Sequence, residues 1–156
     1  MSRTIDFHGW HFVVDPERTR EAYASILDRG AHCCSCLYCK NFVAQRECEL
    51  PEDIRSLFNL VGIDPLKDAE VWQAGPLEGG YTVYGGWWHF IGEVVTEGET
   101  PIRLKPVATG LGRDWEFVFL DKTSDLKLSS LPTAPLVSVQ MTVWLPWVLK
   151  ESFPSG

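Results

Sequence analysis

The stretch Val137-Ser-Val-Gln-Met-Thr-Val-Trp-Leu145 decides the fold class of this chain. Every second residue in it is apolar, namely Val137, Val139, Met141, Val143 and Leu145, and the residues between them are Ser138, Gln140, Thr142 and Trp144. Successive side chains of a β-strand point to opposite faces of the sheet, so this period of two predicts a strand with one buried face. The chain should therefore contain a sheet, with these five apolar side chains in its core.

The same period extends back through most of the second half of the chain. Turn-forming Gly, Pro and Asp residues separate further apolar segments. We expect strands at Glu70–Gln73, Tyr81–Tyr84, Trp87–Thr96, Ile102–Lys105 and Trp115–Leu120. Gly85 and Gly86 lie between two of these segments, Tyr81–Tyr84 and Trp87–Thr96, and favour a bulge or a sharp bend there.

The first half carries helical signals after one expected strand around Thr4–Val14. Asp15 and Pro16 are typical of a helix start, and Gly30 of a helix end, which predicts a helix over Pro16–Asp28. The apolar spacing predicts two more helices, at Leu37–Cys48 and Pro51–Val61. Helices followed by strands indicate an α+β fold, with the N-terminal helices packed on a largely antiparallel, curved β-sheet.

Length and composition suit one globular domain. The chain has 156 residues, of which 45% are hydrophobic and 22% charged, values that lie within the ordinary globular range. We therefore expect a single domain over residues 1–156, with a loose tail at residues 151–156.

The charge balance and the absence of long apolar runs exclude several partners. With 14 basic and 21 acidic residues, the formal charge is −7, so we expect no binding to nucleic acid, whose phosphates require Lys and Arg. The longest apolar stretches fall far short of the roughly 20 residues that cross a bilayer, and no membrane association is expected. The first residues resemble no secretory signal, so the expected protein is soluble and cytoplasmic.

Four of the five cysteines, Cys33, Cys34, Cys36 and Cys39, crowd into seven residues. An odd cysteine number is a poor basis for a secreted disulfide framework, whereas a Cys-x-x-Cys turn can supply two of the ligands of a tetrahedral zinc ion. Zn–S bonds of about 2.3 Å require sulfur atoms roughly 3.8 Å apart. We predict a zinc site formed by these four cysteines and, as the distant ligand, His89, with His11 as the second choice.

Three other interpretations of the same cysteines stay open. Cys33-x-x-Cys36-x-x-Cys39 matches the opening of a ferredoxin motif, and an iron–sulfur cluster would need Cys48 as its fourth thiolate. If Cys36 begins the following helix, the helix dipole would make it a reactive redox thiol. The cysteines can also be small buried residues without chemistry.

A resemblance to a family adds to this interpretation. Cys34-x-Cys36-x-x-Cys39-x-Asn41-Phe42 and the later Gly86-Trp87-Trp88-His89-Phe90-Ile91-Gly92, with Leu50-Pro51 and Gly62-Ile63-Asp64-Pro65 between them, carry it. The chain resembles an uncharacterised bacterial protein family that has a Cys-x-Cys-x-x-Cys-x-Asn-Phe motif and a later Gly-Trp-aromatic-His motif. The resemblance implies a bacterial source and a shared architecture, and no activity.

Two functional hypotheses follow from the sequence. The first is a small metal-binding or thiol-dependent domain centred on residues 33–39. The second is a metal-free binding module that holds a protein or a small ligand on an aromatic face of the sheet, because six of the seven tryptophans lie on or beside expected strands. No residue stands out as catalytic.

Overall fold

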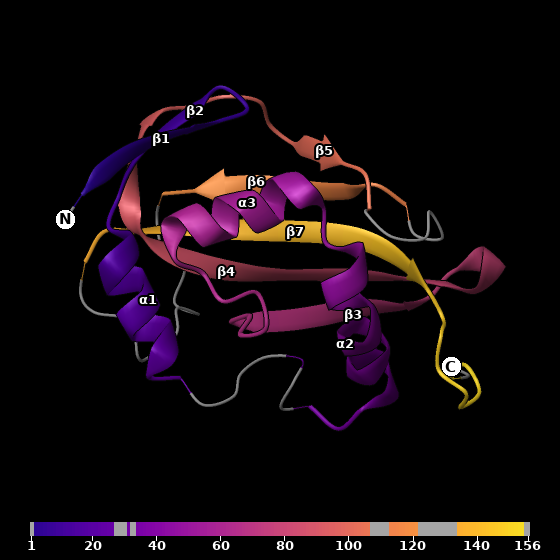
Figure 1. Cartoon of the computed structure of the whole chain (residues 1–156). Helices are drawn as coiled ribbons and strands as arrows, with labels where there is room; N and C mark the ends of the chain where they lie inside the picture. The colour runs from indigo at the N-terminus through magenta and orange to yellow at the C-terminus, as the bar shows by residue number, and fades with distance from the viewer. Residues whose placement is uncertain (1, 27–30, 32–33, 107–112, 122–133, 155–156) are drawn as a thin grey trace.

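In the computed structural model, which describes residues 2–26, 31, 34–106, 113–121 and 134–154, seven strands form one antiparallel sheet beside three α-helices (Figure 1). Along the chain the elements are β1 (Arg3–Phe7), β2 (Trp10–Val14), α1 (Pro16–Ala24), α2 (Leu37–Glu49), α3 (Glu52–Val61), β3 (Glu70–Pro76), a short 3₁₀ turn (Glu78–Gly80), β4 (Tyr81–Thr96), β5 (Ile102–Leu104), β6 (Trp115–Leu120) and β7 (Leu136–Pro146). The strand order is β1-β2-β4-β7-β6-β5, with β3 also paired to β4. The predicted α+β fold is confirmed.

Strand β4 is the central strand of the sheet and pairs with three other strands. One of its edges pairs with β7 from Tyr81 to Ile91, and the other pairs first with β3 and then with β2 (Figure 1). The pairing of β4 with β7 runs through Gly85 and Gly86 without a register shift, so the bulge predicted there is wrong. The two predicted strands on either side of these glycines are one continuous strand.

The core lies between the sheet and helices α2 and α3. The five alternating apolar residues of β7 are all buried, as predicted, and they share a face with Trp88 of β4 and Phe117 of β6. Phe58 of α3 packs on Trp88 with ring centroids 5.0 Å apart, and Phe42 of α2 packs on Tyr84 at 5.3 Å. These contacts fix both helices on one face of the sheet.

Helix α1 occupies the gap that β3 and β2 leave along the edge of β4. The Tyr23 hydroxyl accepts a hydrogen bond from the His89 amide at 3.1 Å and donates one to the His89 carbonyl at 2.9 Å. Thr19 Oγ1 accepts from the Ile91 amide at 3.0 Å, and the Asp15 amide donates to the Ile91 carbonyl at 3.0 Å. The helix thereby satisfies backbone groups of β4 that a neighbouring strand would otherwise pair.

Helix α1 is shorter than predicted. It ends at Ala24, because Ser25 Oγ bonds back to the Ala22 carbonyl and the Ile26 amide closes a tighter turn on the Tyr23 carbonyl. The predicted last residue, Asp28, and the predicted cap at Gly30 lie outside the described residues. The other two predicted helices are confirmed to within one residue at each end.

The single strand predicted around Thr4–Val14 is wrong, since the segment is the hairpin β1–β2. His8 and Gly9 form its two-residue turn with φ values of 46° and 82°, the positive values that a tight hairpin turn requires. Near the other end of the chain, Phe153 lies in the tail that was expected to be loose, and its ring packs on Trp147 with centroids 4.9 Å apart.

Candidate metal centre

Three cysteine thiols converge at the start of α2. The Sγ atoms of Cys34, Cys36 and Cys39 all lie within 4.8 Å of one another, and those of Cys34 and Cys36 are 3.3 Å apart. These separations bracket the roughly 3.8 Å between sulfurs in a tetrahedral zinc site. Cys34 and Cys36 are exposed and Cys39 is half-buried, so an ion at this point would be in contact with solvent.

The local backbone explains why the thiols meet. Cys36 is the N-cap of α2, and its Sγ accepts a hydrogen bond from the Cys39 amide at 3.4 Å. Cys34 lies just before the helix, and its Sγ accepts from the Cys36 amide at 3.5 Å. The first turn of a helix has free N–H groups and a positive dipole end, and both stabilise negatively charged sulfur.

Two of the three thiols differ strongly in acidity. The hydrogen bond from the Cys36 amide, together with those from the neighbouring thiols, lowers the pKa of Cys34. Burial raises the pKa of Cys39, and the adjacent sulfurs add to that effect. Cys34 is therefore the thiol that the structure favours as thiolate, whereas the sequence pointed to Cys36 as the reactive one.

The helix that carries these cysteines is bound firmly to the sheet. The Tyr84 hydroxyl of β4 donates to the Tyr38 carbonyl at 2.7 Å and accepts from Asn41 Nδ2 at 3.2 Å. Asn41 Nδ2 also donates to the Pro146 carbonyl, and Gln45 Nε2 donates to the same carbonyl at 2.8 Å. The Oδ1 atom of Asn41 accepts from the Val148 amide at 2.9 Å. Burial raises the pKa of Tyr84, which keeps its hydroxyl protonated as the donor in this network.

Of the five predicted ligands, the structure brings together Cys34, Cys36 and Cys39, whereas Cys33 lies outside the described residues. His89 is not in this group. It follows Trp88 in β4 and therefore points to the opposite face of the sheet from Trp88 and Tyr84, the face on which α2 and α3 do not pack. His89 is fully buried, and in the described part of the chain neither of its ring nitrogens has a hydrogen-bond partner.

Two other residues named from the sequence also lie apart. Cys48 is nine residues beyond Cys39 on the same helix, about 14 Å away at 1.5 Å per residue, so the iron–sulfur interpretation loses its fourth thiolate. His11, the second choice as distant ligand, lies in β2 and its Nδ1 contacts Asp6 Oδ1.

Sequence analysis missed the residues that hold the cysteines in place. In the sequence Asn41 is visible only as part of a motif, although it is completely buried and its side chain bonds α2 to the end of β7. The signal was an Asn two residues after the last clustered Cys, inside a predicted helix, where Asn is unfavourable. Tyr84 was treated only as a strand residue, and its hydroxyl contact with α2 has no signal in the local sequence.

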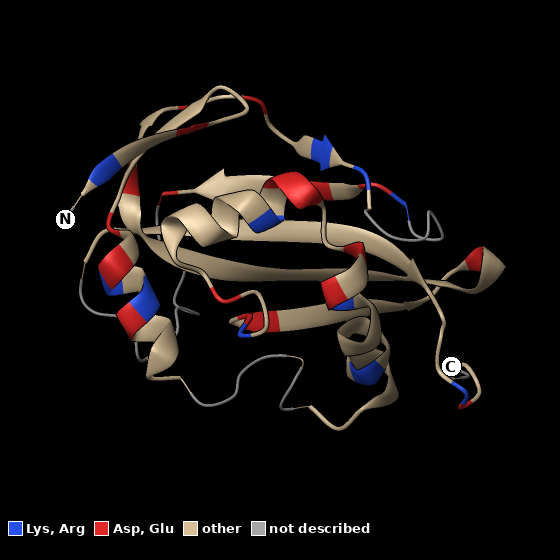
Figure 2. Ribbon diagram, in the orientation of Figure 1, with Lys and Arg blue, Asp and Glu red and all other residues tan. Residues whose placement is uncertain are grey.

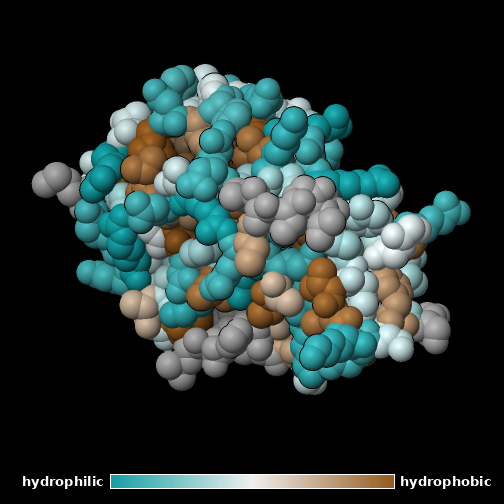
Figure 3. Space-filling view, turned by 45° about the vertical axis from the view of Figure 1, so that its right-hand side comes forward, coloured by the Kyte–Doolittle hydropathy of each residue, from teal (hydrophilic) through white to brown (hydrophobic). Residues whose placement is uncertain are grey.

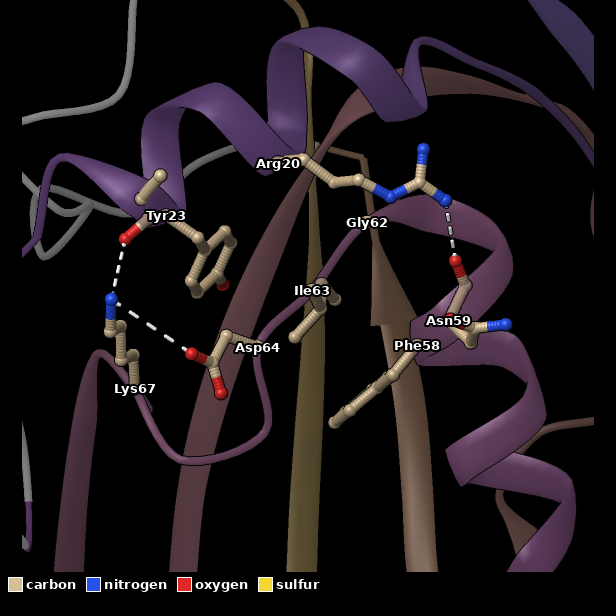
Figure 4. Close-up of a pocket in the computed structure, with 9 residues that line it drawn as sticks. Arg20, Tyr23, Phe58, Asn59, Gly62, Ile63, Asp64 and Lys67 are labelled. Atoms are coloured by element: carbon tan, nitrogen blue, oxygen red, sulfur yellow. Dashed lines mark hydrogen bonds and ion pairs between the residues drawn. The ribbon is translucent and has the colours of Figure 1, made fainter.

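A hollow of about 240 Å³ lies between the ends of α1 and α3 (Figure 4). Lys67 Nζ donates to the Tyr23 carbonyl at 2.9 Å and lies 3.9 Å from Asp64, and Arg20 donates to the Asn59 carbonyl at 2.9 Å. Figure 4 shows these contacts along the edges of the hollow. Both cations neutralise the C-terminal ends of helices, so we assign this hollow a structural role.

The surface is mixed in character. Basic and acidic residues are interspersed along α1 and α2 in Figure 2, and Figure 3 shows hydrophobic side chains in separate patches between hydrophilic ones. The tryptophans divide between core and surface, since Trp10, Trp88 and Trp115 are buried and Trp72 is 43% exposed. No helix in the described part of the chain combines the length and the apolar character needed to span a membrane.

Comparison of the chain with protein-family models, with curated proteins and with solved structures finds no match. The function must therefore be inferred from the geometry of the three cysteines and of the residues around them.

Proposed function

We propose that this protein binds a thiophilic metal ion, with zinc as the first candidate, through Cys34, Cys36 and Cys39. The observation that carries the proposal is the convergence of three free thiols within 4.8 Å at the N-terminus of α2. Thiolate ligands favour zinc and other soft ions over magnesium or calcium, which take oxygen ligands.

The surroundings of the thiols support an ion that stays accessible. Structural zinc sites are closed by four protein ligands, whereas sites for exchange or catalysis keep one position open. Two of the three thiols are exposed, so a fourth ligand can approach from solvent. Cys33, the neighbouring predicted ligand, is the first protein group to test in that position. His89, the predicted distant ligand, is tested with it, although it points to the face of the sheet opposite to α2.

The test is metal analysis and thiol titration on protein purified without added metal, for the wild type and for single Cys→Ser variants. We expect near-stoichiometric zinc and masked thiols in the wild type, and loss of the zinc in Cys34→Ser, Cys36→Ser and Cys39→Ser. Cys48→Ser is the matched control, because Cys48 is an exposed cysteine of the same helix and lies outside the cluster, and it should keep the metal.

Metal-free protein with five freely reacting thiols would contradict the proposal. Cys33→Ser and His89→Gln extend the series to the fourth position. Zinc loss in one of these two variants alone would identify that residue as the fourth ligand, and retention in both would indicate an external one.

A second candidate function is thiol–disulfide exchange, favoured by the 3.3 Å between Cys34 and Cys36 and by the lowered pKa of Cys34. In this reaction the Cys34 thiolate attacks a substrate disulfide and releases one substrate thiolate, which takes up a proton. The Cys36 thiol then loses its proton, and its sulfur attacks Cys34, which releases the second substrate thiol and leaves a Cys34–Cys36 disulfide. Metal-free protein whose Cys34 alkylates first in the same titrations would favour this function.

A further inference from the structure

Helix α2, which follows Cys36 and contains Cys39, also carries one member of a buried ion pair. Arg46, in the third turn of α2, places Nη1 2.5 Å from Oδ1 of Asp68, which stands just before β3. The two side chains are 2% and 0% exposed. Burying both charges costs desolvation energy that their attraction only offsets. Such a pair therefore adds little to stability, and it is better suited to holding its two segments in one relative position.

The second oxygen of Asp68 leads to the cysteines. Asp68 Oδ2 accepts a hydrogen bond from the amide of Ala31 at 2.9 Å, and Ala31 is itself buried. The carbonyl of Ala31 accepts from the amide of Cys34 at 3.2 Å. Ala31 therefore connects the Asp68 carboxylate to the backbone of Cys34.

The two oxygens of Asp68 thus reach the two halves of the candidate site. Oδ1 contacts Arg46, on the helix that supplies Cys36 and Cys39, and Oδ2 reaches Cys34 through Ala31. Asp68 is held to the sheet in turn, because the next amide, that of Ala69, donates to the Trp87 carbonyl of β4 at 2.8 Å. The carboxylate thereby contacts both segments that supply the three thiols.

We propose that Asp68 is a positioning residue for the metal site, in which its carboxylate, clamped by Arg46, holds Cys34 against Cys36 and Cys39. This inference rests on the proposed metal binding. Residues outside the ligand shell that fix ligands in this way change metal affinity by roughly 10- to 100-fold when they are replaced.

The test uses Co²⁺ as a spectroscopic probe of the same thiolates. Asp68→Asn keeps the shape of the side chain but has an oxygen at only one of the two positions that Arg46 and Ala31 contact, and an NH₂ group at the other. We expect cobalt affinity to fall by about tenfold or more, with altered thiolate-to-cobalt absorption bands. A purely structural role would lower the melting temperature and leave the spectrum of the bound cobalt unchanged.

Val137→Ala is the matched control for loss of stability. Val137 is fully buried in β7, about 30 Å along that strand from Pro146, where α2 is attached. This variant should melt at a lower temperature than the wild type and keep its cobalt affinity and spectrum.

Ala31→Pro covers the case in which Asp68→Asn does not fold. It removes the amide that donates to Asp68 and changes neither member of the ion pair with Arg46, and we expect the same loss of cobalt affinity. Wild-type affinity and spectrum in a folded Asp68→Asn or Ala31→Pro protein would overturn the inference alone. A wild-type protein that takes up no cobalt through its thiols would overturn the proposed function, and the inference with it.

Discussion

His89 combines complete burial with the absence, among the described residues, of a hydrogen-bond partner for either ring nitrogen. Burial disfavours the charged imidazolium and lowers its pKa from 6.5 to about 4. Between pH of about 4 and 6.5, His89 therefore binds a proton in the unfolded chain and not in the folded protein. The stability associated with neutral His89 is fully present above pH 6.5 and is lost as the pH falls from 6.5 towards 4.

We expect the free energy of unfolding to drop by about 2 kcal/mol from this one residue between pH of about 7.5 and about 5. Urea unfolding at the two pH values measures the drop, and His89→Leu should remove that part of it. An equal drop in wild type and His89→Leu would show that His89 is charged or paired in the folded protein.

The same residue shows how far single positions could be predicted. The spacing of the cysteines along the chain identified Cys34, Cys36 and Cys39 because a short turn brings neighbours together whatever the rest of the fold does. The distant ligand depended on which face of β4 the helices cover. Tyr84 and Trp88 contact α2 and α3, so the helices cover the face of β4 that carries these two side chains. His89 points to the opposite face.

Among the elements, β3 leaves no free space for a Cβ atom at Gly85 or Gly86 of β4. A Cβ atom at Gly86 would lie 2.5 Å from the Glu70 carbonyl oxygen, which belongs to the backbone of β3. At Gly85 it would lie 2.0 Å from Cζ2 of Trp72, a side chain that is 43% exposed and has room to move. The two glycines are therefore explained by close packing rather than by a bend.

This difference predicts a ranking between two otherwise similar variants. Gly86→Ala should lower the free energy of unfolding by about 1–3 kcal/mol, because the backbone of β3 must shift. Gly85→Ala should cost less, because the Trp72 ring can rotate away. Chemical unfolding of both proteins, followed by tryptophan fluorescence, measures the ranking. A larger loss in Gly85→Ala would mean that Trp72 is fixed more rigidly than its exposure indicates.

Elements with a strong internal period were predictable from sequence, and their neighbours in space were not. The alternation in Val137–Leu145 and the helical spacing in Pro51–Val61 each reflect one buried face, so both predictions are confirmed. The bulge at Gly85–Gly86 was wrong because a glycine that makes room for another strand resembles a glycine that bends its own. The hairpin at His8–Gly9 was missed because its turn is not one of the Asn-Gly, Asp-Gly or Gly-Gly pairs that signal a two-residue hairpin turn.

At the scale of the whole molecule, each helix is joined to the sheet by contacts that neither part can make alone. Phe58 of α3 packs on Trp88, the Tyr84 hydroxyl holds α2, and the Tyr23 hydroxyl pairs with both backbone groups of His89. In every case the partner belongs to β4. Loss of the sheet would expose the apolar side of each helix and leave buried polar groups unpaired.

We therefore expect the helices and the sheet to unfold in one transition. Far-ultraviolet circular dichroism, which follows the helices, and tryptophan fluorescence, which reports mainly on the sheet, should give the same midpoint in urea. Tyr23→Phe sharpens the test, because it leaves the buried amide and carbonyl of His89 without their partner and should cost about 1–3 kcal/mol. If the molecule is one cooperative unit, both probes will shift together in this variant. If α1 and the other helices melt separately, the dichroism midpoint will fall in Tyr23→Phe while the fluorescence midpoint stays at its wild-type value, because the hydroxyl would then stabilise only the helix that carries it.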